Sequence, residues 1–202
     1  MIVLTLMGRA RSRGGVIVIV YGYEGSGAGH WQRWLAGELG VQGVPFVFPE
    51  LPDPGAPERD AWVRALDDVV EGAGDAGVIF VCHSLGCIAV DHLLAARHAR
   101  GAAERVHAAL LVAPPSPYLL FEPIQSFLPP PRARAAWAAL ASRTLVVGSD
   151  NDEHAGAEEF EELARAIGAR CRLLPGSGHL NTDAGLGPWP FALEWLRSVG
   201  AL

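Results

Sequence analysis

Short, continuous apolar runs dominate the hydrophobic pattern of this chain. They are rich in Val and Ile and do not alternate with polar residues, which is typical of strands buried on both faces of a parallel sheet. These runs predict strands at residues 15–21, 44–48, 78–83, 106–112 and 144–148, and a further strand is expected at residues 170–174. Turn residues follow each run, so the sequence predicts a sheet with its functional loops at the carboxyl ends of the strands.

Between these runs, apolar residues recur at the spacing of a helix face. One stretch places Trp62, Leu66, Val69 and Val70 on a single stripe that ends at Gly72. Similar patterns predict further helices at residues 30–40, 85–97, 158–167 and 191–199. Strands that alternate with helices predict an α/β fold, with a mostly parallel sheet and helices on both faces.

Residues 114–134 interrupt this alternation with many prolines and several large apolar side chains. We expect this segment to form a minimal cap over a site, although a surface loop that packs on its own core is the alternative. Residues 1–14 are expected to be a leader of uncertain order, because their apolar start precedes Arg9, Arg11 and Arg13. Residues 15–202 are then one domain.

The composition and net charge limit which binding partners and which cellular compartment are expected for this protein. Half of the 202 residues are hydrophobic, which suits one domain with a full core. The net charge of −6, without a run of like charges, argues against nucleic acid as a partner. Three cysteines make a disulfide framework improbable and favour the cytoplasm, and the apolar start is too short to cross a membrane.

Ser84 stands where the third predicted strand meets the next helix. A strand, a sharp turn and a helix around a serine form a nucleophile elbow, which exposes the hydroxyl at the edge of the sheet. The N–H of Leu85, at the start of the helix, then suits an oxyanion formed at an attacked carbonyl. Cys82 replaces the first Gly of the usual G-x-S-x-G pattern. The alternative interpretation is a buried strand and helix joined by a serine that has no catalytic role.

Two further segments with chemically capable side chains follow later strands. Asp150 and Asp152 come after the fifth predicted strand, and His179 comes after the sixth. Serine, acid and histidine in this chain order match the α/β-hydrolase triad, in which His takes the serine proton and the carboxylate orients the imidazole. The order leaves open which of the two aspartates is the acid.

Four motifs, at residues 25–32, 83–87, 149–152 and 178–190, resemble the small serine hydrolases of the YdeN and retinoblastoma-binding protein 9 type. The resemblance covers most of residues 15–200. It implies an α/β-hydrolase fold, Asp152 as the triad acid with Asp150 in reserve, and the Tyr23 N–H as second oxyanion donor. Glu153 stands where the family has a proline, and Glu24 is a further departure.

We therefore predict a serine hydrolase that cleaves a small to medium ester, thioester or activated amide through an acyl-serine, with no metal or organic cofactor. Glu24, Trp31, Tyr118 and Trp189 are the expected substrate-binding residues. Two alternatives stay open: the same triad used for elimination or acyl transfer, and a catalytically weak module that binds a protein partner.

Overall fold

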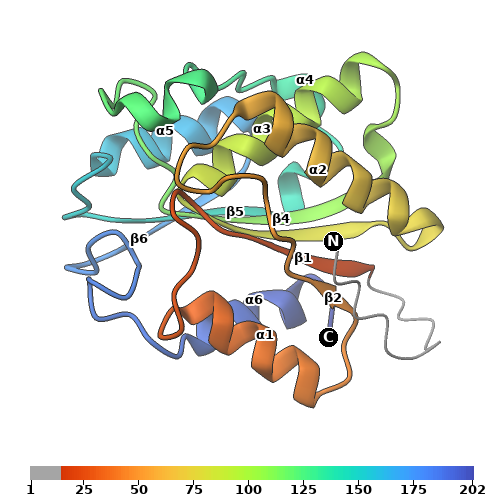
Figure 1. Cartoon of the computed structure of the whole chain (residues 1–202), viewed down its shortest axis with the longest axis horizontal. Helices are drawn as coiled ribbons and strands as arrows, with labels where there is room; N and C mark the ends of the chain where they lie inside the picture. Colours follow the sequence, from red (N-terminus) through yellow and green to blue (C-terminus); the bar gives the residue numbers. More distant parts are fainter. Residues whose placement is uncertain (1–14) are drawn as a thin grey trace.

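The computed structural model describes residues 15–202, and a sheet of six parallel strands runs through its centre (Figure 1). The order across the sheet is β2-β1-β3-β4-β5-β6, and each neighbouring pair is parallel. The strands are β1 (Val16–Val20), β2 (Phe46–Val47), β3 (Val78–His83), β4 (Val106–Val112), β5 (Thr144–Ser149) and β6 (Arg170–Leu174). All six predicted strands are present, and β2 is shorter than its apolar run.

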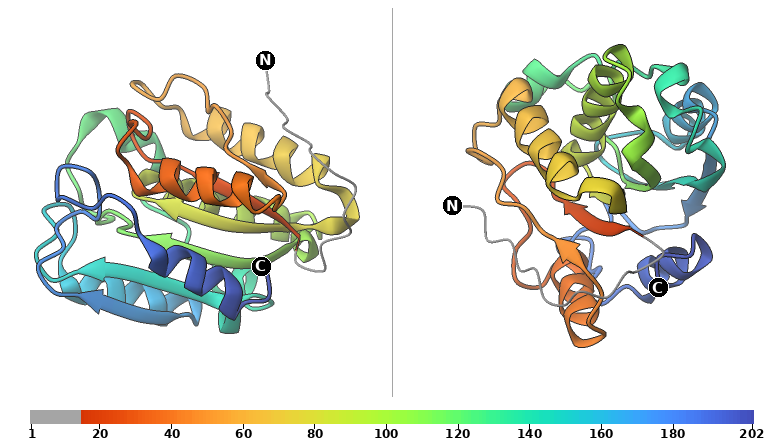
Figure 2. Two further views of the ribbon diagram at one scale, coloured as in Figure 1. Left: turned by 90° about the horizontal axis from the view of Figure 1, so that it is seen from below. Right: turned by 90° about the vertical axis from the view of Figure 1, so that its right-hand side faces the viewer.

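Helices cover both faces of the sheet, as predicted (Figures 1 and 2). One face carries α1 (Trp31–Val41) and α6 (Pro190–Ser198), and the other carries α2 (Arg59–Gly72), α3 (Leu85–Ala99) and α5 (Ala157–Ile167). The pleat of the strands divides the core accordingly. In β1, Ile17 and Ile19 pack toward α1 and α6, whereas Val18 and Val20 pack toward α2 and α3.

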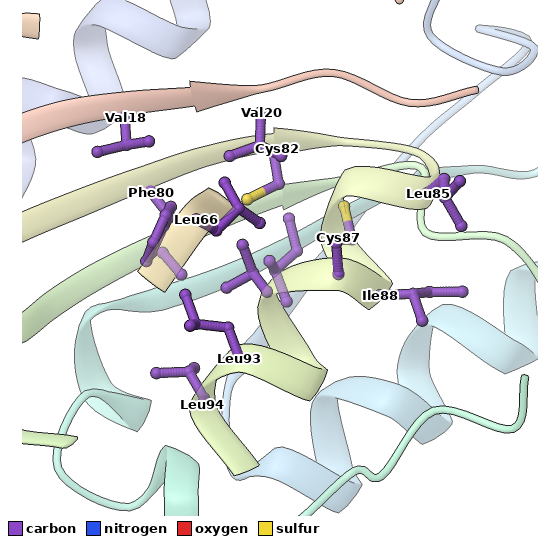
Figure 3. Close-up of a cluster of buried hydrophobic side chains, with 14 of the residues drawn as sticks. Val18, Val20, Leu66, Phe80, Cys82, Leu85, Cys87, Ile88, Leu93 and Leu94 are labelled. Carbon is purple, nitrogen blue, oxygen red and sulfur yellow. The ribbon is translucent and has the colours of Figure 1, made fainter. Parts of the chain in front are cut away.

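The core beside α3 shows why the sequence folds this way (Figure 3). The predicted stripe of α2, from Trp62 to Val70, is buried against it. The helix α3 is apolar on most of its circumference, and Leu85, Cys87, Ile88, Leu93 and Leu94 are all buried. A helix that is hydrophobic nearly all round belongs inside the protein, which fixes its first residues firmly against the sheet.

The connections place a topological switch point between β1 and β3. From β1 the chain moves outward to β2, and from β2 it returns across β1 to β3. The loops after β1 and β3 therefore separate at the carboxyl edge of the sheet, which is where open α/β sheets bind ligands. Gly22 follows β1 and Ser84 follows β3.

Residues 114–134 contain no strand and one short helix, η3 (Glu122–Phe127), followed by α4 (Arg134–Trp137), which the sequence pattern did not predict. Phe127 is buried and packs edge-to-face on Trp62. Asp91 of α3 accepts hydrogen bonds from the Arg132 N–H and from the Trp137 indole. This part of the segment is therefore fastened to α2 and α3.

The predicted leader, residues 1–14, lies outside the described residues. Within residues 15–202, no helix has both the length and the apolar character needed to cross a membrane.

We predict that Gly86→Ala destabilises the fold by about 1–3 kcal/mol. A Cβ at Gly86 would lie 2.5 Å from the Tyr21 carbonyl oxygen and 2.7 Å from that of Val20, and backbone atoms cannot move aside cheaply. Urea denaturation measures the change. The control is Gly37→Ala in α1, where a Cβ meets no atom within 4 Å among the described residues. That variant should gain about 0.5–1 kcal/mol of helix stability, and equal effects at the two positions would refute the close-packing argument.

Candidate active site

Ser84 occupies the sharp turn between β3 and α3 with φ of 51° and ψ of −126°. This left-handed conformation is strained for a residue other than glycine and is typical of a nucleophile elbow. The Ser84 N–H donates to the Val112 carbonyl at 2.9 Å, which fixes the turn to β4. Gly22 lies directly beside it, because a Cβ on Gly22 would come within 2.8 Å of the Ser84 Cβ.

Three side chains from three loops form a continuous hydrogen-bonded chain. The Nε2 of His179 lies 2.9 Å from the Ser84 Oγ, and its Nδ1 lies 3.0 Å from each carboxylate oxygen of Asp152. The Asp152 side chain is fully buried. An ionised carboxylate only accepts, so Nδ1 carries the proton and Nε2 is left to accept from the serine hydroxyl. This is the arrangement that a serine nucleophile with a histidine base requires.

Residues 149–151, which precede Asp152 in the loop after β5, bond to the turn before His179 and not to His179 itself. Asp150 accepts the Gly176 N–H at 2.7 Å, and Asn151 accepts the Gly178 N–H at 2.8 Å. The Ser149 Oγ accepts the Ser177 N–H at 2.9 Å. Three consecutive side chains thus clamp the turn that precedes His179. Asp152, not Asp150, is the carboxylate in contact with the imidazole.

The start of α3 and the loop after β1 meet beside the serine hydroxyl. Leu85 is the first residue of α3, where N–H groups lack acceptors within the helix. The Gly22 Cβ position lies 3.2 Å from the Ser84 Oγ and 3.3 Å from the Leu85 nitrogen, so the loop after β1 reaches the same point. The N–H of Tyr23, the next residue, has no acceptor among residues 15–202. Tyr23 and Leu85, the two residues expected to donate to an oxyanion, both line the cavity that holds Ser84.

A cavity of about 710 Å³ opens above Ser84 and His179. Its apolar wall comes from the segment after β4, with Leu119, Leu120, Phe121 and Ile124. The glycine-rich loop after β1 and residues 181–183 also line it. Glu24 and Asp183 contribute carboxylates to the lining, and among residues 15–202 no lysine or arginine lines the cavity. The lining therefore combines an apolar wall with carboxylate groups.

Comparison with known protein families matches residues 17–198 to the family described as serine hydrolase. The chain belongs to the serine hydrolase family. Comparison with curated proteins gives no significant match.

Solved structures agree with this serine hydrolase in fold. The ydeN gene product of B. subtilis is 22% identical, with a TM-score of 0.78, over 93% of this chain and 100% of that one. A YdeN-like hydrolase of Pectobacterium atrosepticum is 23% identical, with a TM-score of 0.70, over 94% and 92%. MGS-M2, an α/β hydrolase from a Medee basin deep-sea metagenome, is 12% identical, with a TM-score of 0.67, over 96% and 91%. The α/β-hydrolase fold predicted from the sequence is confirmed.

Three of the four residues expected to bind substrate in this serine hydrolase do not line the cavity. Trp31 is fully buried, donates its indole N–H to the Leu180 carbonyl at 2.9 Å and packs on Trp189. Tyr118 is 80% exposed. Their role in substrate binding stays a prediction. Trp31 and Trp189 are buried in the core, where aromatic residues on the inner face of a helix belong more often than in a ligand site. Glu24 does line the cavity.

Sequence reasoning missed a row of histidines beside the triad. The ring centroids of His30 and His83 are 4.8 Å apart, those of His83 and His179 are 5.0 Å apart, and those of His154 and His179 are 4.4 Å apart. His83 also bonds through Nε2 to the His179 carbonyl at 2.9 Å. His30, His83 and His154 each lie at or after the carboxyl end of a strand, which is the position that pointed to His179 in the sequence.

Burial keeps two of these rings neutral. It lowers the pKa of His30 to about 4, with smaller contributions from His179 and Arg33. Burial also lowers the pKa of His83 well below its ordinary value, again assisted by His179. Among residues 15–202, no group of three or more His, Cys, Asp or Glu side chains is arranged to hold a metal ion.

We predict that stability falls as the pH drops from 6.5 toward 4. The unfolded chain binds protons at His30 and His83 near pH 6.5, whereas the folded chain does not. The stability is therefore fully present above pH 6.5 and is lost as the pH falls toward the folded pKa of His30, about 4. His30→Asn removes one of these protons but keeps an acceptor for the Gln32 N–H at the start of α1.

In His30→Asn, the slope of the unfolding free energy against pH should then be smaller than in the natural protein by up to about 1.4 kcal/mol per pH unit. Urea denaturation at several pH values measures it, with exposed His98→Asn as the control. An unchanged pH dependence in His30→Asn would contradict the assignment.

Proposed function

We propose that this serine hydrolase is a carboxylesterase-like enzyme that cleaves a small to medium ester, thioester or activated amide through an acyl-serine intermediate. The observation that carries the proposal is the unbroken hydrogen-bonded chain from the Ser84 hydroxyl through His179 to the buried Asp152, placed at the base of a 710 Å³ cavity. The odd number of cysteines supports a cytoplasmic location.

In the first half of the reaction, the Ser84 Oγ attacks the substrate carbonyl and its proton moves to the His179 Nε2. Asp152, bonded to Nδ1, stabilises the imidazolium that forms. The carbonyl oxygen becomes an oxyanion, which the N–H groups of Tyr23 and Leu85 stabilise. As the bond to the leaving group breaks, that group takes the proton from Nε2 and the acyl-serine ester remains.

In the second half, water replaces the leaving group. His179 removes a proton from the water as its oxygen attacks the acyl carbonyl, and the same amides hold the second oxyanion. Collapse of this intermediate breaks the ester to Ser84, whose oxygen recovers the proton from Nε2. The products are the free acid and the alcohol, thiol or amine, with no change of oxidation state.

The lining of the cavity supports an uncharged, partly apolar substrate. Leu119, Leu120, Phe121 and Ile124 offer a wall on which a short or medium acyl chain can bury its apolar surface. Glu24 and Asp183, with no lysine or arginine among the described residues of the lining, oppose anionic groups. Neutral esters are therefore better substrates than thioesters of phosphorylated carriers in this proposal.

We predict that Asp152→Asn lowers kcat/KM by about 10³-fold or more, because an amide no longer selects the histidine tautomer that accepts the serine proton. Asp150→Asn is the matched control, since its side-chain oxygen still accepts the Gly176 N–H. It should stay within about threefold of the natural enzyme, by the usual size of surface substitutions. Initial rates on p-nitrophenyl butyrate measure both variants, and the reverse order would give the role of triad acid to Asp150.

Ser84→Ala sets the baseline for these rates, and its hydrolysis should fall to the level of buffer. Its melting temperature should stay close to that of the natural enzyme, because Ser84 lies at a turn and its side chain contributes little to the core. Free acid, and not a transferred acyl group or an olefin, should be the product of the natural enzyme. A folded Ser84→Ala variant that keeps most of its esterase activity would overturn the proposed function.

A further inference from the structure

His154 packs directly against the imidazole of the triad. Its ring centroid lies 4.4 Å from that of His179, and the two ring planes meet at 89°, so the contact is edge-to-face. The His154 side chain is 39% exposed and lines the cavity. Neither the proposed proton transfers nor the hydrogen bonds of the triad side chains give this ring a role.

The backbone of His154 is fixed to the triad and to the loop after β4. Its N–H donates to Asp152 Oδ1 at 2.9 Å, and its carbonyl accepts the Ser116 N–H at 2.9 Å. The Ser116 hydroxyl in turn donates a hydrogen bond to the Glu159 carboxylate of α5, with 2.5 Å between the two oxygens. His154 is therefore held between the loop after β4 and the loop after β5, with its ring against His179.

The charged groups that surround His154 come from three places. His179 faces it across the ring contact, Asp152 and Glu153 belong to its own loop, and Glu159 reaches it through Ser116. The exposed Glu153 carboxylate lies 3.7 Å from Nε2. Burial and then His179 lower the pKa of His154, while Asp152 and Glu153 act in the opposite direction. The net effect lowers the pKa of His154 below its ordinary value, which favours the neutral ring.

We propose that His154 is a positioning residue for His179: its neutral ring holds the imidazole in the plane that joins Ser84 to Asp152, and its protonation switches the reaction off. This inference rests on the proposed function. During attack, the Ser84 proton moves to the His179 Nε2 and creates a cation there. A second cation on a ring 4.4 Å away repels it at close range.

This requirement gives the pH profile a specific form. If both imidazoles must be neutral, the active fraction at low pH falls with the square of the proton concentration, so log kcat/KM falls with a limiting slope of two. If a protonated His154 were tolerated, enzyme with the proton on His154 alone would still react. The limiting slope would then be one.

His154→Phe separates these cases because it keeps an aromatic ring against His179 but cannot be protonated. We expect a slope of two in the natural enzyme and of one in His154→Phe. At pH 8 the kcat values of these two proteins should agree within about threefold. His154→Ala, which loses the ring, should lower kcat about tenfold or more across the pH range with a smaller change in KM. His98→Phe, at the exposed end of α3, is the matched control and should keep the slope of two.

Initial rates after a rapid pH jump, followed by an assay at pH 7.5 to show that the enzyme is still folded, measure these slopes. A slope of one in the natural enzyme, or a slope of two that persists in His154→Phe, overturns the inference. These results leave the proposed function intact as long as Ser84→Ala is inactive. Activity in Ser84→Ala would instead overturn the proposed function itself.

Discussion

The close approach of the β3–α3 turn to the end of β1 is the constraint on which the rest of the site depends. Gly86 packs against the carbonyls of Tyr21 and Val20, and Gly22 packs against Ser84. No side chain fits at either contact, so the loop after β1 lies directly beside the serine hydroxyl and the Leu85 nitrogen. The strained backbone at Ser84 costs about 1–3 kcal/mol. The buried helix α3 and the bond to Val112 hold it in place.

The histidine side of the site depends on a second set of buried contacts. Leu180, directly after His179, has a positive φ of 52° and is completely buried. Its carbonyl accepts the indole N–H of Trp31, while the carbonyl of His179 is bonded to His83. Side chains that line no part of the reaction path, such as Trp31, therefore fix the backbone of the proposed base. Neutral histidines suit this role, because a buried ring pairs its ring nitrogens without a charge to bury.

Much of the fold could be predicted because the physical signals are local. Continuous β-branched runs indicate buried parallel strands, and the abrupt stop at Ser84 indicates an elbow, without knowledge of distant contacts. The choice between Asp150 and Asp152 lies in an irregular loop that has no periodicity to read. The choice follows from tertiary contacts: Asp150 bonds to the turn at residues 176–178, and Asp152 bonds to His179. Trp31 and His154 depend likewise on contacts between segments far apart in sequence, so their spacing could not reveal their partners.

The central claim is that Ser84 is the nucleophile, and a fluorophosphonate probe tests it most directly. The probe phosphonylates a serine only where a base and an oxyanion site activate the hydroxyl. Intact mass spectrometry of the native protein should show one added phosphonyl group per chain, and peptide mapping should place it on Ser84. The same protein unfolded in urea should not react. A folded protein that takes up no probe, or that carries the adduct elsewhere with Ser84 unmodified, would contradict the account.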